Sequence, residues 1–569
     1  MAKLEMREQP TRKKIIPLVM AIANNIIKKL GLVKKINEAV EWDRTHWNIS
    51  PGGLCKMLVL GTMTDIRIPL THIEERLEGI DTEFYLEATE KSTFVNESNV
   101  GEALERLGEG EYEKVYESLA LSAVTEYEIP VTRMQSDTTT ISFYGEYDID
   151  KMEISEEERE AVLHIEKGYN KDGRRGCNQV IVGQITNEVG IPLVNRTLDG
   201  ATSDIEWNRE AIKYASELSA RFAEGIYVAD CKLVTEEHIK TMNDPEKRIQ
   251  FVSKCPSNFG DKLKERTILK AYENNRWESI NTSSEATNAA EYKGVSFIEE
   301  VCGSPMRLVV LESDTLRNKA EKAFVKKEEE LSSLIKISEK QVWSCRVDAQ
   351  AECERFLASK QAELFDCNVV IEERVKEKWS KGRRGADTKP TLITTYHLHI
   401  ENAGKSEAAY QKYLQVESCM VLISNVTDSM SDEDLLNKYK GQQVVENSFR
   451  QLKSPQLASV IYLKNPTRIK ALTMLLTFSL LLRALIQYRL RDGLENFKEQ
   501  QPDQEIYAGW GGKPLRNPTF KLFYEHTVNC CFERESSGVY SFAWISSETR
   551  SRVEPLLNLL RISLELLLL

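Results

Sequence analysis

The order of strands and helices between Val131 and Lys254 limits most strongly what this chain can fold into. A β-branched, alternating segment starts at Val131, and a second apolar stretch turns back on itself at Asn187–Gly190, which is typical of a hairpin. Ser203 and Glu206 then fit a capping box that opens a helix. Helical and strand patterns alternate from there, at 208–224, 225–230, 235–242 and 251–254. This order predicts an α/β fold with a sheet of mixed strand direction.

The rest of the chain differs in texture from this segment. Residues 1–130 carry apolar residues at helical spacing, and the first 35 residues hold nine bases and two acids. A helical domain is expected there, and its charge is compatible with DNA binding or with a solvated face. Residues 131–260 hold the first part of the sheet, 261–414 interrupt it with a charged helical stretch and β-like pieces, 415–491 return to it, and 492–569 have no clear pattern.

Charge is distributed unevenly along the chain. The net charge of −12 argues by itself against a nucleic-acid-binding protein. The segment Lys438–Arg491, however, holds ten Lys or Arg residues and a single acid, Glu446. A local excess of bases is typical of a surface that binds phosphate groups. We therefore expect a phosphate contact in this segment that the overall charge conceals.

The helix predicted at Glu433–Lys453 places polar residues around Glu446. At about 100° per residue, four of its side chains fall within about 40° of Glu446, namely Tyr439, Gln442, Arg450 and Lys453. Val445, Phe449 and Leu452 form an adjacent apolar stripe that would dock on a sheet. A simple surface pair between Glu446 and Arg450, four residues apart, is the alternative interpretation.

Two aspartates stand where an α/β sheet often places functional acids. Asp137 lies inside a predicted strand, where an acid is disfavoured, and Asp230 ends a short apolar strand. Each is weak by itself, because acids at strand ends are also common in turns. Together with Glu446 they make three carboxylates from separate elements, the kind of set that two-metal phosphoryl transfer needs.

Several segments resemble the DDE transposases of prokaryotic insertion sequences. The segment "YKGQQVVENSFRQLK" looks like the family's Tyr-x2-Arg-x3-Glu-x6-Lys signature, with Tyr439, Glu446 and Lys453 matching and Gln442 replacing the arginine. "QSDTTTISFYG" and "VADCKL" are similar to the segments of the two catalytic aspartates. "GYNKDGRRGCNQV" and "DGATSDIEW" resemble two further family segments, and "GLVKKINEAV…ISPGGLCKMLVLGTMTD" is similar to the N-terminal helical domain of one branch.

This resemblance implies an RNase H-like mixed-sheet core, an α+β insertion at 261–414 and a helical DNA-binding domain at 1–130. It implies that Asp137, Asp230 and Glu446 are catalytic and hold two Mg²⁺ ions, with Mn²⁺ as a substitute. The expected partners are double-stranded DNA, as terminal inverted repeats and target, and a second copy of the chain in a homodimer. The residues expected to contact DNA are Tyr439, Gln442, Arg450, Lys453, Arg174, Arg175 and Trp379.

Some of these assignments have alternatives. Arg174 and Arg175 equally fit a solvated turn, and Trp379 fits a packed surface tryptophan. An RNase H-like nuclease that does not join DNA, and an inactive transposase-derived DNA-binding protein, are the other functions that the sequence permits. The longest apolar run, Leu472–Leu482, has 11 residues, against roughly 20 for a membrane span. With 11 scattered cysteines that suit free thiols, this predicts a cytoplasmic, nucleoid-associated protein with no membrane contact.

Overall fold

The computed structural model describes residues 14–568 except 65–71, 146, 148–154, 156–158, 160–161, 223–224, 248, 281–289, 380, 382–388, 455–462 and 543. The chain forms two compact units. The first unit comprises residues 1–233, 244–250 and 440–569, and the second comprises 234–243 and 251–439. The five domain ranges expected from the sequence stay a prediction.

One sheet region of the first unit has four strands of mixed direction. They are β2 (Arg133–Phe143), β3 (Asn178–Asn187), β4 (Pro192–Leu198) and β5 (Ile226–Ala229), in the order β4-β3-β2-β5. Strands β2, β3 and β4 form an antiparallel meander, and β5 lies parallel to β2. The mixed α/β fold predicted from the sequence is confirmed, as is the hairpin that turns near Asn187–Gly190.

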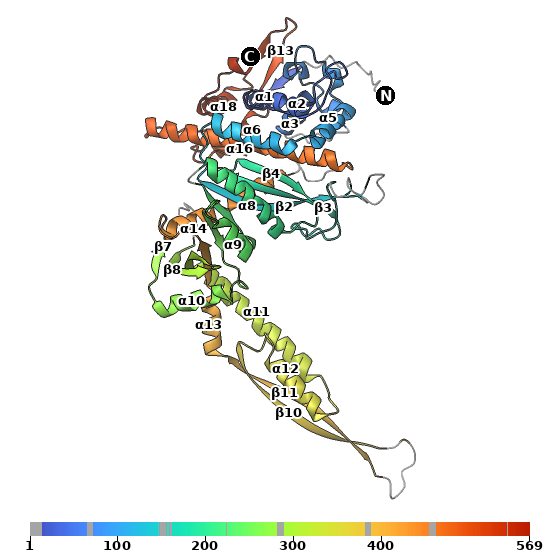
Figure 1. Ribbon diagram of the computed structural model, residues 1–569, viewed down its shortest axis with the longest axis vertical. Coiled ribbons are helices and arrows are strands. Elements are labelled where there is room, and N and C mark those ends of the chain that lie inside the picture. The colour runs from blue at the N-terminus through green and yellow to red at the C-terminus, as the bar shows by residue number, and fades with distance from the viewer. Residues whose placement is uncertain are drawn as a thin grey trace, which may run out of the picture. The chain divides into compact units, whose positions relative to one another are not determined.

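Helix α8 (Asp204–Arg221) covers one face of this sheet (Figure 1). The predicted capping box is present: Ser203 accepts a hydrogen bond from the Glu206 amide, and Glu206 accepts one from the Ser203 amide. The buried indole of Trp207 donates a hydrogen bond to Ser136 of β2 over 2.9 Å. Gly183 of β3 permits this approach, since a Cβ there would lie 2.5 Å from the Trp207 ring.

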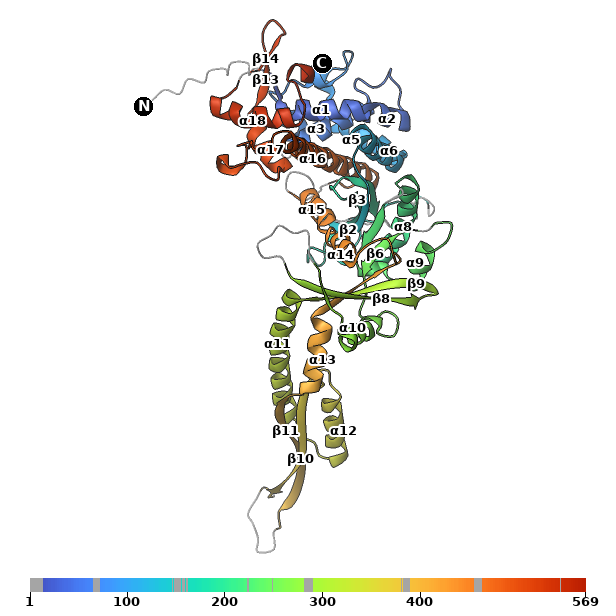
Figure 2. The same ribbon diagram turned by 90° about the vertical axis from the view of Figure 1, so that its left-hand side faces the viewer.

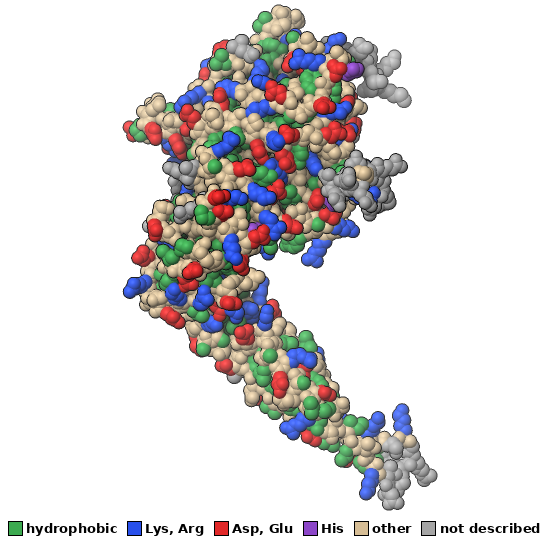
Figure 3. All heavy atoms as spheres, in the orientation of Figure 1, with side chains coloured by type: hydrophobic (Ala, Val, Ile, Leu, Met, Phe, Trp, Pro, Cys, Tyr) green, Lys and Arg blue, Asp and Glu red, His purple; other side chains and the backbone are tan. Residues whose placement is uncertain are grey.

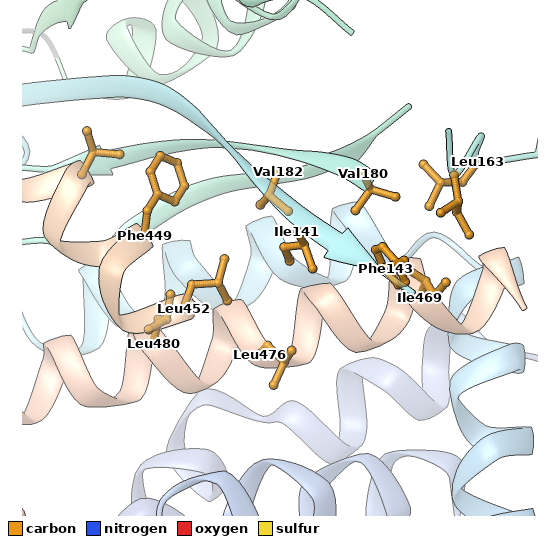
Figure 4. Packing of buried hydrophobic residues seen from close by; sticks show 12 residues of the cluster. Ile141, Phe143, Leu163, Val180, Val182, Phe449, Leu452, Ile469, Leu476 and Leu480 are labelled. Atoms are coloured by element: carbon orange, nitrogen blue, oxygen red, sulfur yellow. The ribbon is translucent and has the colours of Figure 1, made fainter. Parts of the chain in front are cut away.

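Helices α15 (Gln443–Leu452) and α16 (Pro466–Gln500) cover the opposite face (Figure 2). Figure 4 shows the apolar side chains that join them to the sheet. Ile141 and Phe143 of β2 and Val180 and Val182 of β3 pack against the helices. The helices contribute Val445, Phe449, Leu452, Ile469, Leu476 and Leu480. The apolar stripe predicted for Val445, Phe449 and Leu452 is thus confirmed as a docking face.

Helix α16 also packs against the N-terminal helices of the same unit (Figure 1). Its contacts are with α3 (Pro51–Thr62), α5 (Glu97–Glu109) and α6 (Tyr112–Glu126). The other N-terminal helices are α1 (Leu18–Leu30), α2 (Leu32–Ala39) and α4 (Ile73–Arg76). Among the described helices, α16 alone is long and apolar enough to cross a membrane by length and composition. Its most apolar window is 83% buried inside the protein, as in the central helix of a folded unit.

The C-terminal segment, which has no clear pattern of strands or helices in the sequence, returns to the N-terminal helices. Strands β1 (Ile15–Pro17), β13 (Cys531–Arg534) and β14 (Tyr540–Phe542) form a sheet in the order β1-β13-β14. Helices α17 (Phe520–Thr527) and α18 (Ser547–Leu559) pack on α16. The two ends of the chain therefore stabilise one common unit.

The second unit is built on antiparallel strands. Its larger sheet has the order β6-β12-β9-β8-β7, with bounds Phe251–Lys254, Cys419–Ser424, Ser304–Ser313, Tyr292–Val301 and Glu278–Ile280. A long hairpin, β10 (Phe365–Lys378) and β11 (Thr391–Lys405), packs against α11 (Asp314–Glu339) and α12 (Arg346–Leu357) through an apolar cluster. Its remaining helices are α9 (Glu236–Met242), α10 (Leu263–Asn274), α13 (Glu407–Glu417) and α14 (Asp432–Lys440).

The prediction of a single helix at Glu433–Lys453 is wrong, because the helix is interrupted. The chain forms two helices, α14 and α15, with a break at Gly441 and Gln442. Gly441 lies against the guanidinium of Arg133, which a Cβ at this position would meet at 2.1 Å. The break means that Tyr439 does not belong to the helix that carries Glu446, so the predicted common stripe loses Tyr439.

Candidate active site of the first unit

Asp137, inside β2, and Asp230, directly after β5, lie side by side on two parallel strands. The register of β2 and β5 pairs Gln135 with Val228, and continuing it by two residues brings Asp137 next to Asp230. Strand β5 ends at Ala229, so Asp230 follows it directly, whereas β2 runs on to Phe143. The sequence prediction that these two acids converge is supported by this register.

A third carboxylate and a lysine complete the cluster. The Lys171 ammonium lies 2.9 Å from the Asp204 carboxylate and 3.4 Å from the Asp137 carboxylate. It also donates to the Thr138 hydroxyl over 2.6 Å and to the Thr138 carbonyl over 3.0 Å. Asp204 accepts a further hydrogen bond of 2.6 Å from the Thr138 hydroxyl. One cation therefore partly neutralises a group of acids.

Local structure explains why Asp204 and Lys171 lie next to strand β2. Asp204 is the first residue of α8, held there by the capping box on Ser203. Lys171 belongs to a turn that Asn170 organises: its amide nitrogen donates to Ser142 and Gln179, and its amide oxygen accepts from the backbone of Asp172 and Arg174. The turn thereby presents Lys171 to the part of β2 that extends beyond β5.

The acids influence each other electrostatically. Burial raises the pKa of Asp137, and the nearby Asp204 charge adds to this, while Lys171 and the Thr138 amide oppose it. Burial also raises the pKa of Asp230, and the charges of Asp137 and Asp204 raise it further. For Asp204, burial is outweighed by the hydrogen bonds from Thr138 and Lys171, so its pKa is lowered. The site is therefore short of positive charge, which is the condition that attracts a cation.

Helix α15, which carries Glu446, packs on the face of β2 on which Asp137 lies. Asp137 is paired with Gln184 of β3, and Gln184 contacts Ser448 of α15 at 3.4 Å. Because directly paired residues in an antiparallel ladder point to the same side, Asp137 faces α15 and not α8. Glu446 itself is exposed, at the edge of the docked face of its helix.

Lys453 connects α15 to the turn that carries Lys171. Its ammonium lies 2.6 Å from the carboxylate of Asp172. Gln442 is half-buried at the N-terminus of α15 and makes no capping hydrogen bond with its side chain, while Arg450 is exposed. Three of the four predicted neighbours of Glu446 thus share its helix or the ends of that helix. Tyr439 lies in α14, within the second unit.

The other predicted DNA contacts are spread over the two units. Arg174 and Arg175 are exposed in the turn after Asp172, three and four residues beyond Lys171. Trp379 is half-buried and lies one residue beyond β10 in the second unit, and part of the basic segment around it falls outside the described residues. Their contacts with DNA stay a prediction.

The interpretation of Lys438–Arg491 as a continuous phosphate-binding segment is wrong for part of its bases. Arg468 forms an ion pair with Glu105 at 2.7 Å, Arg483 is buried and donates to the Thr62 carbonyl, and Arg489 lies over the Tyr127 ring. These arginines belong to α16, whose central position directs them into the protein. On the face shown in Figure 3, acidic and basic side chains are interspersed.

The donor atoms at the cluster suit a hard divalent cation. Carboxylate, hydroxyl and carbonyl oxygens are the ligands that Mg²⁺ prefers, and Asp137, Thr138, Asp204 and Asp230 supply them here. Within the described part of the chain, no group of three or more His, Cys, Asp or Glu side chains is arranged closely enough to hold a metal ion. The donor chemistry thus fits Mg²⁺, whereas the spacing of the carboxylates in this arrangement does not, and Lys171 provides the positive charge there.

Sequence reasoning missed Lys171 and Asp204. Both stand in segments that resemble the transposase family. In the first segment the sequence pointed to Arg174 and Arg175 as DNA contacts, and in the second it pointed only to the capping box of Ser203 and Glu206. The available signal was a lysine and an aspartate in two separate family-like segments. Their proximity depends on contacts between residues 33 and 66 positions apart, which no local pattern reveals.

The fold and the acid cluster define an α/β protein with a carboxylate site where β5 ends beside the parallel strand β2. Residues 14–121 match the model of a domain of unknown function, DUF4277. No curated protein matches the chain. The chain is similar to the piggyBac transposase in the cryo-EM structure of its synaptic complex with hairpin DNA. That similarity has 7% identity and a TM-score of 0.37, and it covers 91% of this chain and 81% of the other.

Proposed function

We propose that this protein is a DDE-type DNA transposase that binds the ends of its own insertion sequence, cleaves them and joins them to target DNA. The observation that carries the proposal is the placement of Asp137 beside Asp230, on the face of β2 that α15 covers with Glu446. The resemblance of all three segments to the family's motifs adds support. The active form is proposed to be a homodimer on double-stranded DNA.

Asp137, Asp230 and Glu446 would hold two Mg²⁺ ions, or Mn²⁺ in their place. When bound, such ions activate an attacking oxygen and stabilise the leaving oxygen of a phosphodiester. Lys171 would neutralise Asp137 and Asp204 before a cation arrives and would be displaced from Asp137 when it does. Asp204, held by Thr138 and the capping box, would position Lys171.

The remaining residues would hold the DNA. Arg450 and Lys453 would contact phosphates close to Glu446, with Gln442 donating hydrogen bonds without charge. Lys453 would exchange its contact with Asp172 for a phosphate. Arg174 and Arg175, in the turn that follows Asp172, would also contact the DNA. Tyr439 and Trp379, which belong to the second unit, would provide further DNA contacts.

The test is cleavage of a labelled duplex that carries the inverted repeat flanking the gene, with Mg²⁺ and an unlabelled target plasmid. The wild type is expected to cut at the repeat and to join the cut end to the plasmid. Asp230→Asn is expected to lose cleavage and to retain DNA binding. Asp503→Asn changes an exposed aspartate beyond α16 and is the matched control.

The reaction products distinguish the proposed transposase from the two alternative functions. Cleavage without joined product would indicate a nuclease, and binding without cleavage by the wild type would indicate an inactive DNA-binding protein. If Asp230→Asn cuts as well as Asp503→Asn does, the proposed active site is wrong.

A further inference from the structure

A basic groove runs along the flank of α15 that adjoins Glu446. It has a volume of about 550 Å³ and is lined from α15, α16, α17 and the residues that follow α3, all within the first unit. Asn447, Arg450, Gln451 and Ser454 supply its α15 side. At about 100° per residue these four positions lie on one side of Glu446, whereas Lys453 lies on the other.

The groove carries an excess of positive charge. Its lining contains Arg450, Arg483, Arg491 and Lys521, and the single acid among the lining residues is Glu525. The one contact that Glu525 makes with these bases, to Lys521, is 3.9 Å long and exposed. Such a pair neutralises little, so the groove retains a net positive charge in a chain whose net charge is −12.

Two of the four bases are fixed by the fold. Arg483 is buried, donates to the Thr62 carbonyl and lies over the Phe520 ring at 5.3 Å. The Arg491 side chain donates to the Pro518 carbonyl over 3.1 Å, and burial lowers the pKa of this guanidinium. The buried Arg483 and the half-buried Arg491 therefore contribute fixed positive charge to the groove lining, and the direct phosphate contacts would come from the exposed Arg450 and Lys521.

We propose that this groove binds the phosphodiester backbone of DNA, which adds α16 and the C-terminal α17 to the DNA-binding surface. The inference rests on the proposed function, because it explains why the groove lies beside Glu446. Arg450 is one helical turn, about 5.4 Å, beyond Glu446. A strand whose reacting phosphate lies at Glu446 would then place its next phosphates in the groove. The volume also suits a nucleotide-sized segment, within the usual range of about 300–1,000 Å³ for ligand pockets.

The experiment measures binding of full-length protein to a fluorescent duplex in EDTA, so that no cleavage is required. Arg450 and Lys521 are exposed, so the double variant Arg450→Gln, Lys521→Gln leaves the two fixed arginines and the core unchanged. The matched control is Lys213→Gln, a change of an exposed lysine on α8, which covers the opposite face of the sheet.

Each lost phosphate contact should lower the salt slope by about 0.9 and weaken binding roughly 5-fold at 0.15 M salt. The double variant is therefore expected to bind roughly 30-fold more weakly with a slope reduced by about 2, and the control within 2-fold of wild type. Equal affinity and slope for the double variant and the control would overturn the proposal.

A competition arm distinguishes DNA from free phosphate. Inorganic pyrophosphate is expected to displace the duplex poorly at matched phosphate concentration, and equally good displacement would overturn the assignment to DNA. Because cleavage is not measured, a wild type that fails to cut DNA refutes the proposed function and leaves this binding test intact.

Discussion

The substitution Lys171→Met should lower the free energy of local opening of β2, beside the acid cluster, by about 2 kcal/mol at neutral pH. The ammonium forms ion pairs with Asp204 at 2.9 Å and Asp137 at 3.4 Å, and it donates two hydrogen bonds to Thr138. Hydrogen bonds to charged groups contribute about 1.5–3 kcal/mol each when well shielded. The side chains here are 25–29% exposed, so solvent screening reduces each ion pair to about 1 kcal/mol.

Hydrogen exchange of β2 measures this change locally, which suits a chain of two units better than a global melt. About 2 kcal/mol corresponds to roughly 30-fold faster exchange of the β2 amides in Lys171→Met at pH 7. Lys213→Met on α8 is the control and should exchange as the wild type does. If β2 exchanges equally in both variants, the ion pairs of Lys171 are not stabilising.

The pH dependence follows from the sign of the pKa shifts. The pKa of Asp204 is lowered in the folded state, so its contribution is present above its unfolded value of about 3.9 and is lost as the pH falls through the folded value. The pKa of Lys171 is raised despite burial, through Asp137 and Asp204, so its contribution is lost only as the pH rises through a value above 10.5. The difference between Lys171→Met and wild type should therefore begin to shrink as the pH falls below about 4 and should vanish only below the lowered folded pKa of Asp204.

Three further predictions concern packing and charge. Burial lowers the pKa of Lys56 to about 8. Lys56→Met should therefore stabilise the N-terminal helices by up to about 3 kcal/mol at pH 7. Thermal melts should show this stability gain shrinking as the pH rises from about 8 to 10.5. Gly183→Ala places a Cβ 2.5 Å from the Trp207 ring and should lower the unfolding free energy by about 1–3 kcal/mol in urea; an unchanged midpoint would contradict this packing. A double-mutant cycle of Lys453→Met and Asp172→Asn should give a coupling of about 0.5–1 kcal/mol, and zero coupling would mean that the 2.6 Å pair adds no stability.

The local sequence determined the elements that carry the candidate site. The alternation from Val131 predicted β2, the Asn187–Gly190 turn predicted the hairpin, and Ser203 with Glu206 predicted the start of α8. Each of these depends on residues a few positions apart, through backbone preference or a capping hydrogen bond. The position of Asp230 at the end of an apolar strand was predictable for the same reason.

The tertiary structure decided which of these residues meet and which charges reach the surface. Lys171 joins Asp137 and Asp204 through contacts that span 34 and 33 positions, and the approach of Arg133 to Gly441 accompanies the break before α15. The arginines of α16 turned inward because that helix packs between the sheet and the N-terminal helices, which a count of charges does not show. Strand β1 and strand β13 pair although almost the whole chain separates them. Such contacts depend on how elements pack, because burial and ion pairing join residues that no short sequence window contains.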